Sequence, residues 1–332
     1  MDREERDLLT ALSEAMVEAV ARGAAATVTV DARDRLPATG VGYAADLVLT
    51  ADHVIEREEI RVVLPDGRER SAVRIGRDPS TDLALLRVAE GAVPILEIAE
   101  REPRVGQLVL ALGRPGAEGV QASLGVISAI GGALRTPWGG WLERYIRTDA
   151  IMYPGFSGGP LIDTEGRALG INTSGLAGIP LTIPIRLAWR VAGALAQEGR
   201  VRRGYLGVRT QAVPLAPAQQ ERLGRAQGRG LLIVGIEEGS PAAEGGLRVG
   251  DILTGFQGQP VEDPEDLQGR LIGEGVGRPV ELEVLRGEER RILTVIVGER
   301  REAWEEERWP FRGGRWGFRR RWMPPWAPWW SR

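Results

Sequence analysis

The chain has no cysteine, no lysine and a single histidine among its 332 residues. Without cysteine it can form neither a disulfide nor a thiolate metal site, and one histidine leaves too few ligands for a histidine-based metal centre. We therefore expect no metal and no cofactor. All positive charge is carried by arginine and the net charge is only -3, so the composition indicates no overall attraction to nucleic acid or to membranes.

The sequence also lacks any apolar run long enough to span a membrane, and its first seven residues are acidic rather than basic. A secretory signal combines a basic start with an apolar stretch, so these features predict a cytoplasmic protein. The apolar positions of residues 1 to 25 recur at helical spacing, which predicts an amphipathic helix that caps the next domain. These positions are Leu8, Leu9, Leu12, Met16, Val17 and Val20.

The one histidine, His53, is followed by Asp82 at the start of an apolar run and by Ser157 within the segment GFSGGP. A serine hydroxyl is a weak nucleophile near neutral pH and needs a base to take its proton. His53 is the only imidazole available, and a buried carboxylate such as Asp82 would fix its tautomer. Each residue alone has an ordinary structural explanation, but the three together, in this order, predict the catalytic residues of a serine protease.

The glycines around Ser157 fit the same chemistry. Backbone N–H groups must converge on the oxyanion of a tetrahedral intermediate, and close approach favours residues without side chains. We therefore predict that the N–H groups of Gly155 and Ser157 form the oxyanion hole.

Short runs rich in Val, Leu and Ile, separated by Pro, Gly and Asp turns, dominate residues 26 to 185 and predict antiparallel barrels. Residues 60 to 64 and 107 to 112 are two of these runs. A helical pattern over residues 186 to 198 closes this domain, residues 26 to 198. The basic segment at residues 199 to 202 then reads as an exposed linker.

From about residue 27 to residue 297 the chain resembles the HtrA (Deg) family, whose members join a chymotrypsin-like double β-barrel protease domain to a PDZ domain. The match covers most of the chain and implies a mainly β fold. Three of the matching segments carry chemistry and two are scaffold. The first three are LTADHV (49 to 54), DPSTDLALL (78 to 86) and GFSGGPL (155 to 161), and the others are LPDGR (64 to 68) and GINT (170 to 173).

The resemblance places Met152, Thr173 and Gly175 in the specificity pocket beside the serine. None of them is charged, so an entering Lys or Arg side chain would lose its hydration without a counter-ion. Cleavage is therefore expected after small or medium apolar residues. Such residues are hidden in folded proteins, which implies an ATP-independent endopeptidase for unfolded or damaged chains, acting in protein quality control.

The chain departs from the family pattern just before the nucleophile. The family usually has asparagine where this sequence has Phe156, and Tyr153 adds a second aromatic side chain to the turn. These bulky groups are expected to alter how readily the oxyanion turn changes between competent and incompetent forms. A catalytically silent, peptide-binding or chaperone-like protein is thus the alternative to an active protease.

Residues 203 to 299 resemble a PDZ domain, in which a peptide adds a strand to an exposed sheet edge and backbone N–H groups hold its terminal carboxylate. The resemblance implies a carboxylate cradle that ends at Gly207, an edge strand that begins at Val208, and a helix that forms the opposite wall and begins near Asp263. Asp263 is predicted to cap this helix, with Pro264 in its first turn. The cradle and strand residues are Tyr205, Leu206, Gly207 and Val208, and the helix residues are Leu267 and Leu271.

Residues 300 to 332 form an Arg/Trp/Pro-rich tail that we expect to be disordered. From Trp309 onward it has no acidic residue. This composition suits an anionic membrane surface, unspecific self-association or, less well, nucleic acid. The family resemblance leaves a homotrimer open, although the aromatic side chains that often form it near the N-terminus are missing before Tyr43.

Overall fold

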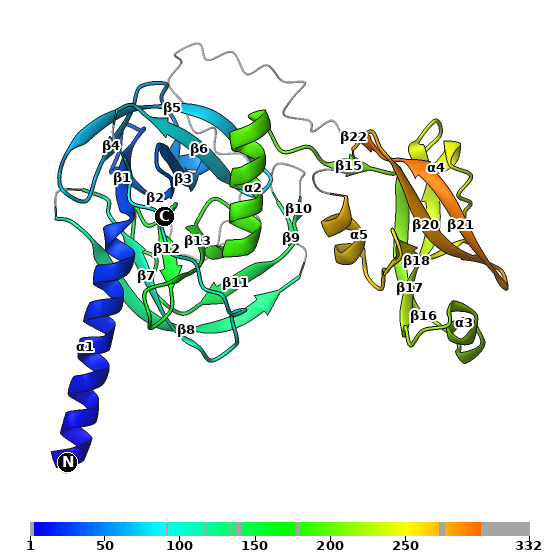
Figure 1. The fold of residues 1–332 in the computed structure, drawn as a ribbon, viewed down its shortest axis with the longest axis horizontal. Helices are drawn as coiled ribbons and strands as arrows, with labels where there is room; N and C mark the ends of the chain where they lie inside the picture. The colour runs from blue at the N-terminus through cyan, green and yellow to red at the C-terminus, as the bar shows by residue number, and fades with distance from the viewer. Residues whose placement is uncertain are drawn as a thin grey trace, which may run out of the picture. The chain divides into compact units, whose positions relative to one another are not determined.

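The computed structural model describes residues 3 to 299 apart from 91, 117, 133, 137–140, 177–179 and 272–275 (Figure 1). The Arg/Trp-rich tail lies outside the described residues, so its expected disorder and its partners stay predictions.

The first barrel is closed and antiparallel, with strand order β1-β2-β3-β6-β5-β4. Its interior is filled by small branched side chains such as Val28, Val48, Val62 and Leu86. The predicted strand at residues 60 to 64 is present as β4. The strands are β1 (Thr27–Asp31), β2 (Ala38–Ala44), β3 (Leu47–Ala51), β4 (Ile60–Val63), β5 (Glu69–Asp78) and β6 (Leu83–Val88).

The second barrel is also closed, with strand order β11-β14-β13-β12-β7-β8. Its core includes Val109, Ile127, Ile146 and Leu161 together with the ring of Phe156. The strands are β7 (Leu108–Gly113), β8 (Gln121–Gly131), β11 (Tyr145–Thr148), β12 (Pro160–Ile162), β13 (Ala168–Thr173) and β14 (Leu181–Pro184), and β9 (Leu134–Arg135) pairs with β10 (Trp141–Leu142) outside the barrel.

The strands nearest the seam between the barrels are buried on both faces. Along β6, Ala84 and Leu86 point into the first barrel, while Leu83 and Leu85 join a cluster that also contains Ile171 of the second barrel. Successive side chains of a strand point to opposite faces, so such a strand must be apolar throughout. This explains the continuous run that follows Asp82.

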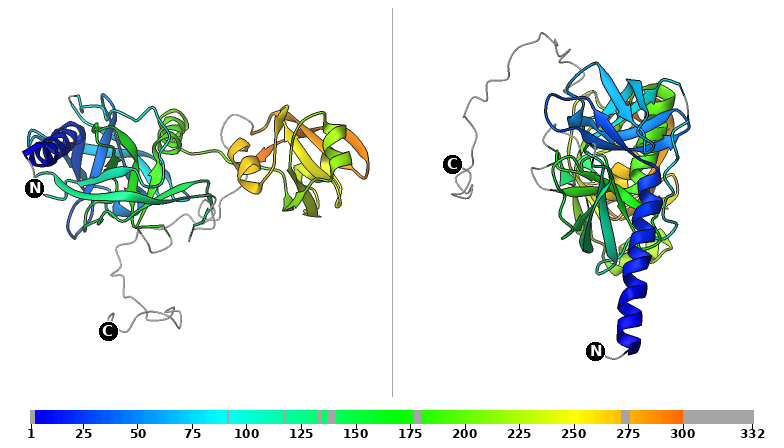
Figure 2. Two further views of the ribbon diagram at one scale, coloured as in Figure 1. Left: turned by 90° about the horizontal axis from the view of Figure 1, so that it is seen from below. Right: turned by 90° about the vertical axis from the view of Figure 1, so that its left-hand side faces the viewer.

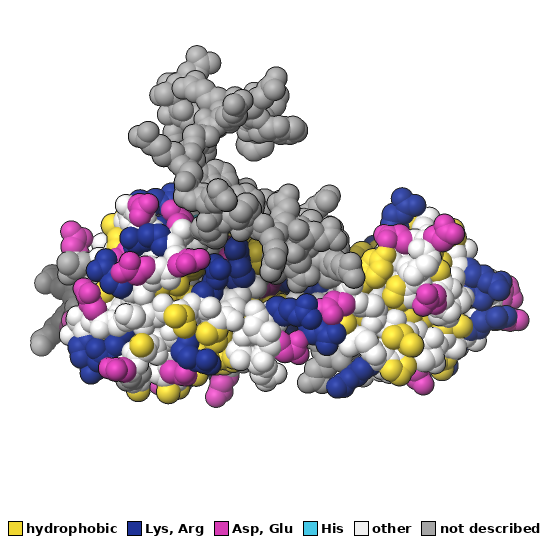
Figure 3. All heavy atoms as spheres, turned by 90° about the horizontal axis from the view of Figure 1, so that it is seen from above, with side chains coloured by type: hydrophobic (Ala, Val, Ile, Leu, Met, Phe, Trp, Pro, Cys, Tyr) yellow, Lys and Arg dark blue, Asp and Glu magenta, His cyan; other side chains and the backbone are white. Residues whose placement is uncertain are grey.

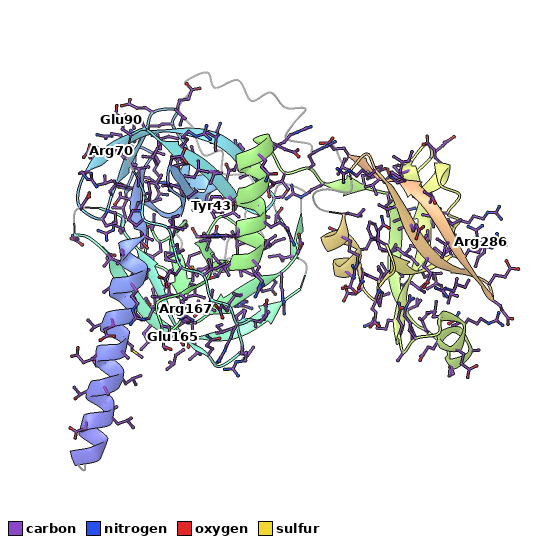
Figure 4. All side chains as sticks on the ribbon, in the orientation of Figure 1. Tyr43, Arg70, Glu90, Glu165, Arg167 and Arg286 are labelled. Atoms are coloured by element: carbon purple, nitrogen blue, oxygen red, sulfur yellow. The ribbon has the colours of Figure 1, made fainter. Side chains whose placement is uncertain are left out.

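Two helices pack on the barrels. α2 (Ile185–Glu198) covers the seam, and Figure 4 labels Tyr43, whose ring meets Trp189 of α2 with centroids 5.4 Å apart. α1 (Arg3–Ala25) packs through its C-terminal end, where Ala19 meets Leu110 and Leu112. Its N-terminal half extends past the barrel with Leu8 71% and Leu9 54% exposed (Figure 2).

The remaining described residues form a smaller β-rich domain with strand order β16-β17-β18-β20-β21, so β16 lies at the edge of the sheet. Asp263 caps α5 by accepting from the Asp266 N–H at 2.8 Å, and Pro264 begins the helix, as predicted. The elements are β15 (Gly204–Tyr205), β16 (Val208–Pro214), α3 (Pro217–Leu223), β17 (Arg229–Ile236), α4 (Pro241–Glu244), β18 (Ile252–Phe256), β19 (Gln259–Pro260), α5 (Pro264–Arg270), β20 (Pro279–Arg286), β21 (Glu289–Ile296) and β22 (Gly298–Glu299).

The prediction of a mainly β chain with a double barrel followed by a second β-rich domain is confirmed. Arginine and acidic side chains are interspersed over the described part of the face shown in Figure 3. Among the described residues, no helix has both the length and the apolar character needed to cross a membrane.

Candidate active site

Asp82 and His53 form a close pair in the first barrel. His53 Nδ1 lies 2.7 Å from Asp82 Oδ2, and the His53 backbone N–H donates to Asp82 Oδ1 at 2.8 Å. The Thr173 hydroxyl, from the second barrel, also donates to Asp82 Oδ2. The Asp82 side chain is 3% exposed and that of His53 is 22% exposed. The carboxylate is thus satisfied by three donors and holds the imidazole by one nitrogen, leaving Nε2 for chemistry.

The turn that presents Asp82 has an unusual backbone. Asp82 has a φ of 56°, in the left-handed region that aspartate tolerates better than most residues. Its N–H donates to the Pro79 carbonyl, and Asp78 accepts from the Thr81 hydroxyl at 2.6 Å. The Asp78 carboxylate also accepts hydrogen bonds from both terminal guanidinium nitrogens of Arg203, at 2.9 and 2.7 Å, in a buried bidentate ion pair.

The turn that presents Ser157 belongs to the second barrel and begins at Gly155, which has a φ of 90°. The Phe156 ring is fully buried and packs edge-on against Tyr153, with centroids 5.5 Å apart. A Cβ at Gly113 would lie 2.3 Å from this ring, so glycine at that position makes the space that Phe156 fills. The large side chain is therefore accommodated in the barrel core.

The Ser157 hydroxyl contacts Ser174 rather than His53. Its Oγ lies 3.0 Å from Ser174 Oγ and accepts from the Ser174 N–H at 3.3 Å. Among the described residues, no hydrogen bond joins Ser157 to His53. The structure thus brings two of the three predicted catalytic side chains into contact and leaves the third bonded to a neighbour.

The backbone N–H groups of Gly155 and Ser157 were predicted to stabilise an oxyanion. Within the described part of the chain, neither donates a hydrogen bond to another protein atom, whereas the N–H of Phe156 between them donates to the Tyr153 carbonyl at 3.0 Å. Both groups are therefore available to an incoming ligand.

The residues assigned to the specificity pocket have different surroundings. Met152 is half-buried against the core of the second barrel, and the Thr173 hydroxyl is bonded to Asp82. Gly175 lies against the acid–base pair, because a Cβ there would be 2.5 Å from His53 Nδ1 and 2.7 Å from Asp82 Oδ2. Their roles in specificity stay predictions.

The residues assigned to peptide binding lie in the smaller domain as follows. Leu206 and Leu267 belong to its buried core, with Val208 and Leu271 half-buried against it. Gly207 has a φ of 77° and a Cβ there would meet Ser240 at 2.2 Å. The Tyr205 hydroxyl donates to the Glu237 carboxylate. Val208 begins the edge strand β16.

Sequence reasoning missed three polar residues at this site. Ser174 contacts the predicted nucleophile, Thr39 contacts the turn around it, and Asp52 precedes His53. Each is a single polar residue without a periodic pattern around it. Only Asp52 had a signal, namely an acidic residue next to the single histidine.

Asp52 is 5% exposed and its Oδ2 accepts from Arg77 Nη2 at 2.5 Å, while its Oδ1 has no partner in the described structure. Burial raises the pKa of Asp52 to about 6, and the opposing attraction of Arg77 does not overcome it. The nearby Asp82 raises this pKa further, whereas Arg74 lowers it. Across the described residues, no three acidic or histidine side chains gather as a metal site requires.

Comparison with known proteins adds an independent finding. A family model for the trypsin-like peptidase domain matches residues 38–171, and one for the PDZ domain matches residues 204–297. The "Probable periplasmic serine endoprotease DegP-like" proteins of Halomonas elongata and Pseudomonas putida (strain GB-1) are 39% and 38% identical over 76% of this chain. The matches cover 54% and 53% of those proteins, so the chain spans about half the length of these curated relatives.

Solved structures are similar to this chain over a larger share of its length and of their own. The "HtrA-type protease AlgW with tripeptide" is 34% identical with a TM-score of 0.71, covering 86% of this chain and 97% of that one. The serine endoprotease from Yersinia pestis is 29% identical with a TM-score of 0.64, covering 86% and 98%. The prediction of a cytoplasmic location is contradicted, because the curated relatives are named as periplasmic proteins.

Replacing Asp52 by Asn should change how stability depends on pH. The folded state holds the Asp52 proton up to about pH 6, whereas the ordinary pKa of an aspartate is 3.8. The native state therefore binds more protons between these values, and the free energy of unfolding contributed by this group falls as pH rises through them. Urea unfolding at pH 4 and pH 7 should show the wild type losing on the order of 2 to 3 kcal/mol relative to Asp52→Asn.

The matched control is Asp34→Asn, since the Asp34 side chain is 92% exposed and the same substitution there removes no buried carboxylate. Equal pH dependence of the wild type and Asp52→Asn would contradict the raised pKa.

Gly175→Ala should separate His53 from Asp82, because the new Cβ would overlap both side chains. Misplacement of a catalytic group by about 1 Å costs roughly a hundredfold in rate, so we expect kcat/KM for a peptide substrate to fall by about that factor. Gly116→Ala is the control, since a Cβ at Gly116 meets no atom within 4 Å. Equal rates for the two variants would show that Gly175 does not pack on the pair.

Proposed function

Because this chain belongs to the HtrA (Deg) family of trypsin-like serine proteases with a PDZ domain, we propose that it is a serine endopeptidase with Ser157 as nucleophile. The observation that carries the proposal is the contact of buried Asp82 with the partly exposed His53, beside a nucleophile turn with two unpaired N–H groups. His53 and Asp82 complete the proposed catalytic triad. The domain boundaries proposed from the sequence are 1–25 helix, 26–198 protease, 199–202 linker, 203–299 PDZ domain and 300–332 tail.

In the proposed reaction, rotation of the Ser157 side chain brings its Oγ from Ser174 to His53 Nε2. His53 takes the hydroxyl proton as Ser157 attacks the scissile carbonyl, and returns it to the leaving amine. Asp82 fixes the imidazole tautomer and stabilises its cationic form. The N–H groups of Gly155 and Ser157 donate to the oxyanion, whose charge develops only as the tetrahedral intermediate forms.

The proposed substrates are unfolded or damaged proteins, cleaved after small or medium apolar residues without ATP. The pocket assigned to Met152, Thr173 and Gly175 offers no charge to a Lys or Arg side chain. The curated relatives are named as periplasmic endoproteases, and we propose a periplasmic site of action on that ground. A homotrimer stays a prediction.

The PDZ domain is proposed to bind peptides by their C-termini and so to recruit substrate or regulate cleavage. Two observations support this: β16 is the edge strand of the described sheet, and α5 contributes apolar Leu267 beside it. A peptide strand could therefore add to β16 while its carboxylate meets the Tyr205–Gly207 cradle. One similar solved protease is titled as bound to a tripeptide.

One observation favours a second function, a peptide-binding protein with a silent protease domain. The predicted nucleophile is bonded to Ser174 and not to His53. If that contact persists when substrate binds, the triad never assembles and only the PDZ groove acts.

Ser157→Ala separates these functions. We expect the wild type to degrade unfolded casein and the variant to leave it intact, because the variant lacks the hydroxyl that attacks the scissile carbonyl in the proposed reaction. Ser71→Ala, on β5 of the other barrel, should retain full activity. Gel electrophoresis of casein over time measures the rates. Equal inactivity of wild type and Ser157→Ala, with and without activating peptides ending in apolar residues, would favour the silent peptide-binding protein.

Gly207→Ala should weaken peptide binding by at least about tenfold, since its positive φ and the 2.2 Å approach to Ser240 leave no room for a side chain in the cradle. Fluorescence anisotropy with a peptide that ends in valine measures the affinity. Gly228→Ala is the control, because a Cβ there meets no atom. A valinamide-ending peptide should bind weakly to every variant, and equal binding of both peptides would overturn carboxylate recognition.

A further inference from the structure

Thr39, on β2 of the first barrel, contacts the nucleophile turn of the second barrel at two places. Its hydroxyl donates to the Gly155 carbonyl at 2.7 Å, and its backbone N–H donates to the Ser157 carbonyl at 3.2 Å. Thr39 is fully buried. One residue of the first barrel therefore holds the carbonyls of Gly155 and Ser157, the two residues that flank Phe156 in the second barrel.

These two contacts complete a pattern of alternating peptide units. In the unit between Gly155 and Phe156, the carbonyl accepts from Thr39 and the N–H donates to Tyr153. In the unit between Ser157 and Gly158, the carbonyl again accepts from Thr39 and the N–H donates to Asn172 at 2.8 Å. Each of these units is thus hydrogen-bonded at both ends and has a fixed direction.

The peptide units that alternate with them carry the two free N–H groups. The N–H of Gly155 and that of Ser157 belong to units adjoining the fixed ones, and neither N–H has a protein acceptor in the described structure. Because a peptide unit is planar, two fixed neighbours restrict how the unit between them can rotate. The carbonyl of the unit that carries the Ser157 N–H also accepts from the Gly159 N–H at 2.9 Å, so Gly159 and the bonds of Thr39 together set the direction of the Ser157 N–H.

The hydroxyl of Thr39 has a fixed direction of its own. It accepts from the Arg114 N–H at 2.8 Å, so its single proton is directed to the Gly155 carbonyl. Arg114 is in turn held by its side chain, which donates to the Thr27 carbonyl at 2.8 Å and to the Ala24 carbonyl at 3.3 Å. We call the two Thr39 contacts to the nucleophile turn the clamp. Through Arg114, the clamp is anchored to the first barrel and to the end of α1.

We propose that Thr39 is a positioning residue for the oxyanion hole, a role that rests on the proposed protease function. Its hydroxyl holds the Gly155 carbonyl away from the bound substrate and keeps the N–H groups of Gly155 and Ser157 directed at the oxyanion. Thr39 touches neither substrate nor the reacting atoms. Its loss should therefore act on the transition state and leave substrate binding in the ground state unchanged.

The test compares Thr39→Val, which keeps the shape and removes the hydroxyl, with Thr39→Ser, which keeps the hydroxyl. Thr27→Val is the matched control, because it removes an equally buried hydroxyl that donates to the Gly23 carbonyl outside the turn and keeps the Thr27 carbonyl that accepts from Arg114. Steady-state cleavage of a chromogenic peptide and inhibition by a peptidyl boronic acid, a tetrahedral analogue, are measured for each variant below its melting temperature.

For Thr39→Val we expect kcat to fall roughly 10- to 100-fold, KM to change less than about twofold, and boronic acid affinity to fall with kcat. Thr39→Ser should stay within about threefold of the wild type, as should Thr27→Val. A purely structural role would give equal losses in both valine variants or would lower only the melting temperature. If Thr39→Val does not fold, Thr39→Cys, with its weak thiol donor, must show the same selective loss of kcat.

The proposal is overturned if Thr39→Val retains the wild-type kcat, or if KM rises while kcat is unchanged. In either case the proposed function stands, provided that Ser157→Ala remains inactive. If the wild type and Ser157→Ala are equally inactive and neither forms a boronic acid adduct, the proposed function fails and the role of Thr39 fails with it.

Discussion

Hydrogen bonds across the seam between the two barrels are the constraint on which the site depends. His53 and Asp82 come from the first barrel and Ser157 from the second, so their mutual geometry depends on how the barrels meet. Thr39 bonds the first barrel to the nucleophile turn, and Thr173 bonds the second barrel to Asp82. Buried apolar side chains from both barrels surround these bonds at the seam, which excludes water and strengthens them. Stability and catalytic geometry therefore rely on the same contacts.

Close backbone approach at this seam explains two glycines. A Cβ at Gly158 would lie 2.0 Å from the Thr39 carbonyl oxygen, and a Cβ at Gly175 would overlap His53 and Asp82. The first glycine also has a φ of 87°, which a side chain would strain. The glycine that follows the nucleophile is thus required by packing between barrels, in addition to any chemical role. From the sequence alone, a glycine that is required by packing cannot be distinguished from one that is required by the oxyanion turn.

The short apolar runs of residues 26 to 185 and the resemblance to the HtrA (Deg) family were enough to predict the double barrel. Of the three predicted catalytic residues, His53 and Asp82 lie in contact, whereas Ser157 is bonded to Ser174. The cap at Asp263 was predictable because capping is local. Thr39 and Ser174 were not, since their partners lie 116 and 17 residues away and nothing local marks a threonine at a strand end. The predicted cytoplasmic location was wrong for a different reason, because the fold of a protein does not determine the compartment in which it acts. The expectation that Phe156 alters how readily its turn changes form stays a prediction, and the space that Gly113 leaves for the Phe156 ring could be found only in the tertiary structure.

The contact between Ser157 and Ser174 and the clamp at Thr39 constrain the nucleophile turn to very different degrees. In the proposed mechanism, rotation of the Ser157 side chain moves its Oγ from Ser174 to His53 and gives up its two contacts to the Ser174 hydroxyl and N–H. Ser174 is exposed, so nothing packs that contact in place. Turning the peptide unit that follows Gly155, or the one that follows Ser157, instead breaks a buried bond to Thr39. Each such bond costs about 1 to 3 kcal/mol when left unmade. The side-chain contact to the exposed Ser174 is therefore easier to undo than the buried backbone bonds of the nucleophile turn.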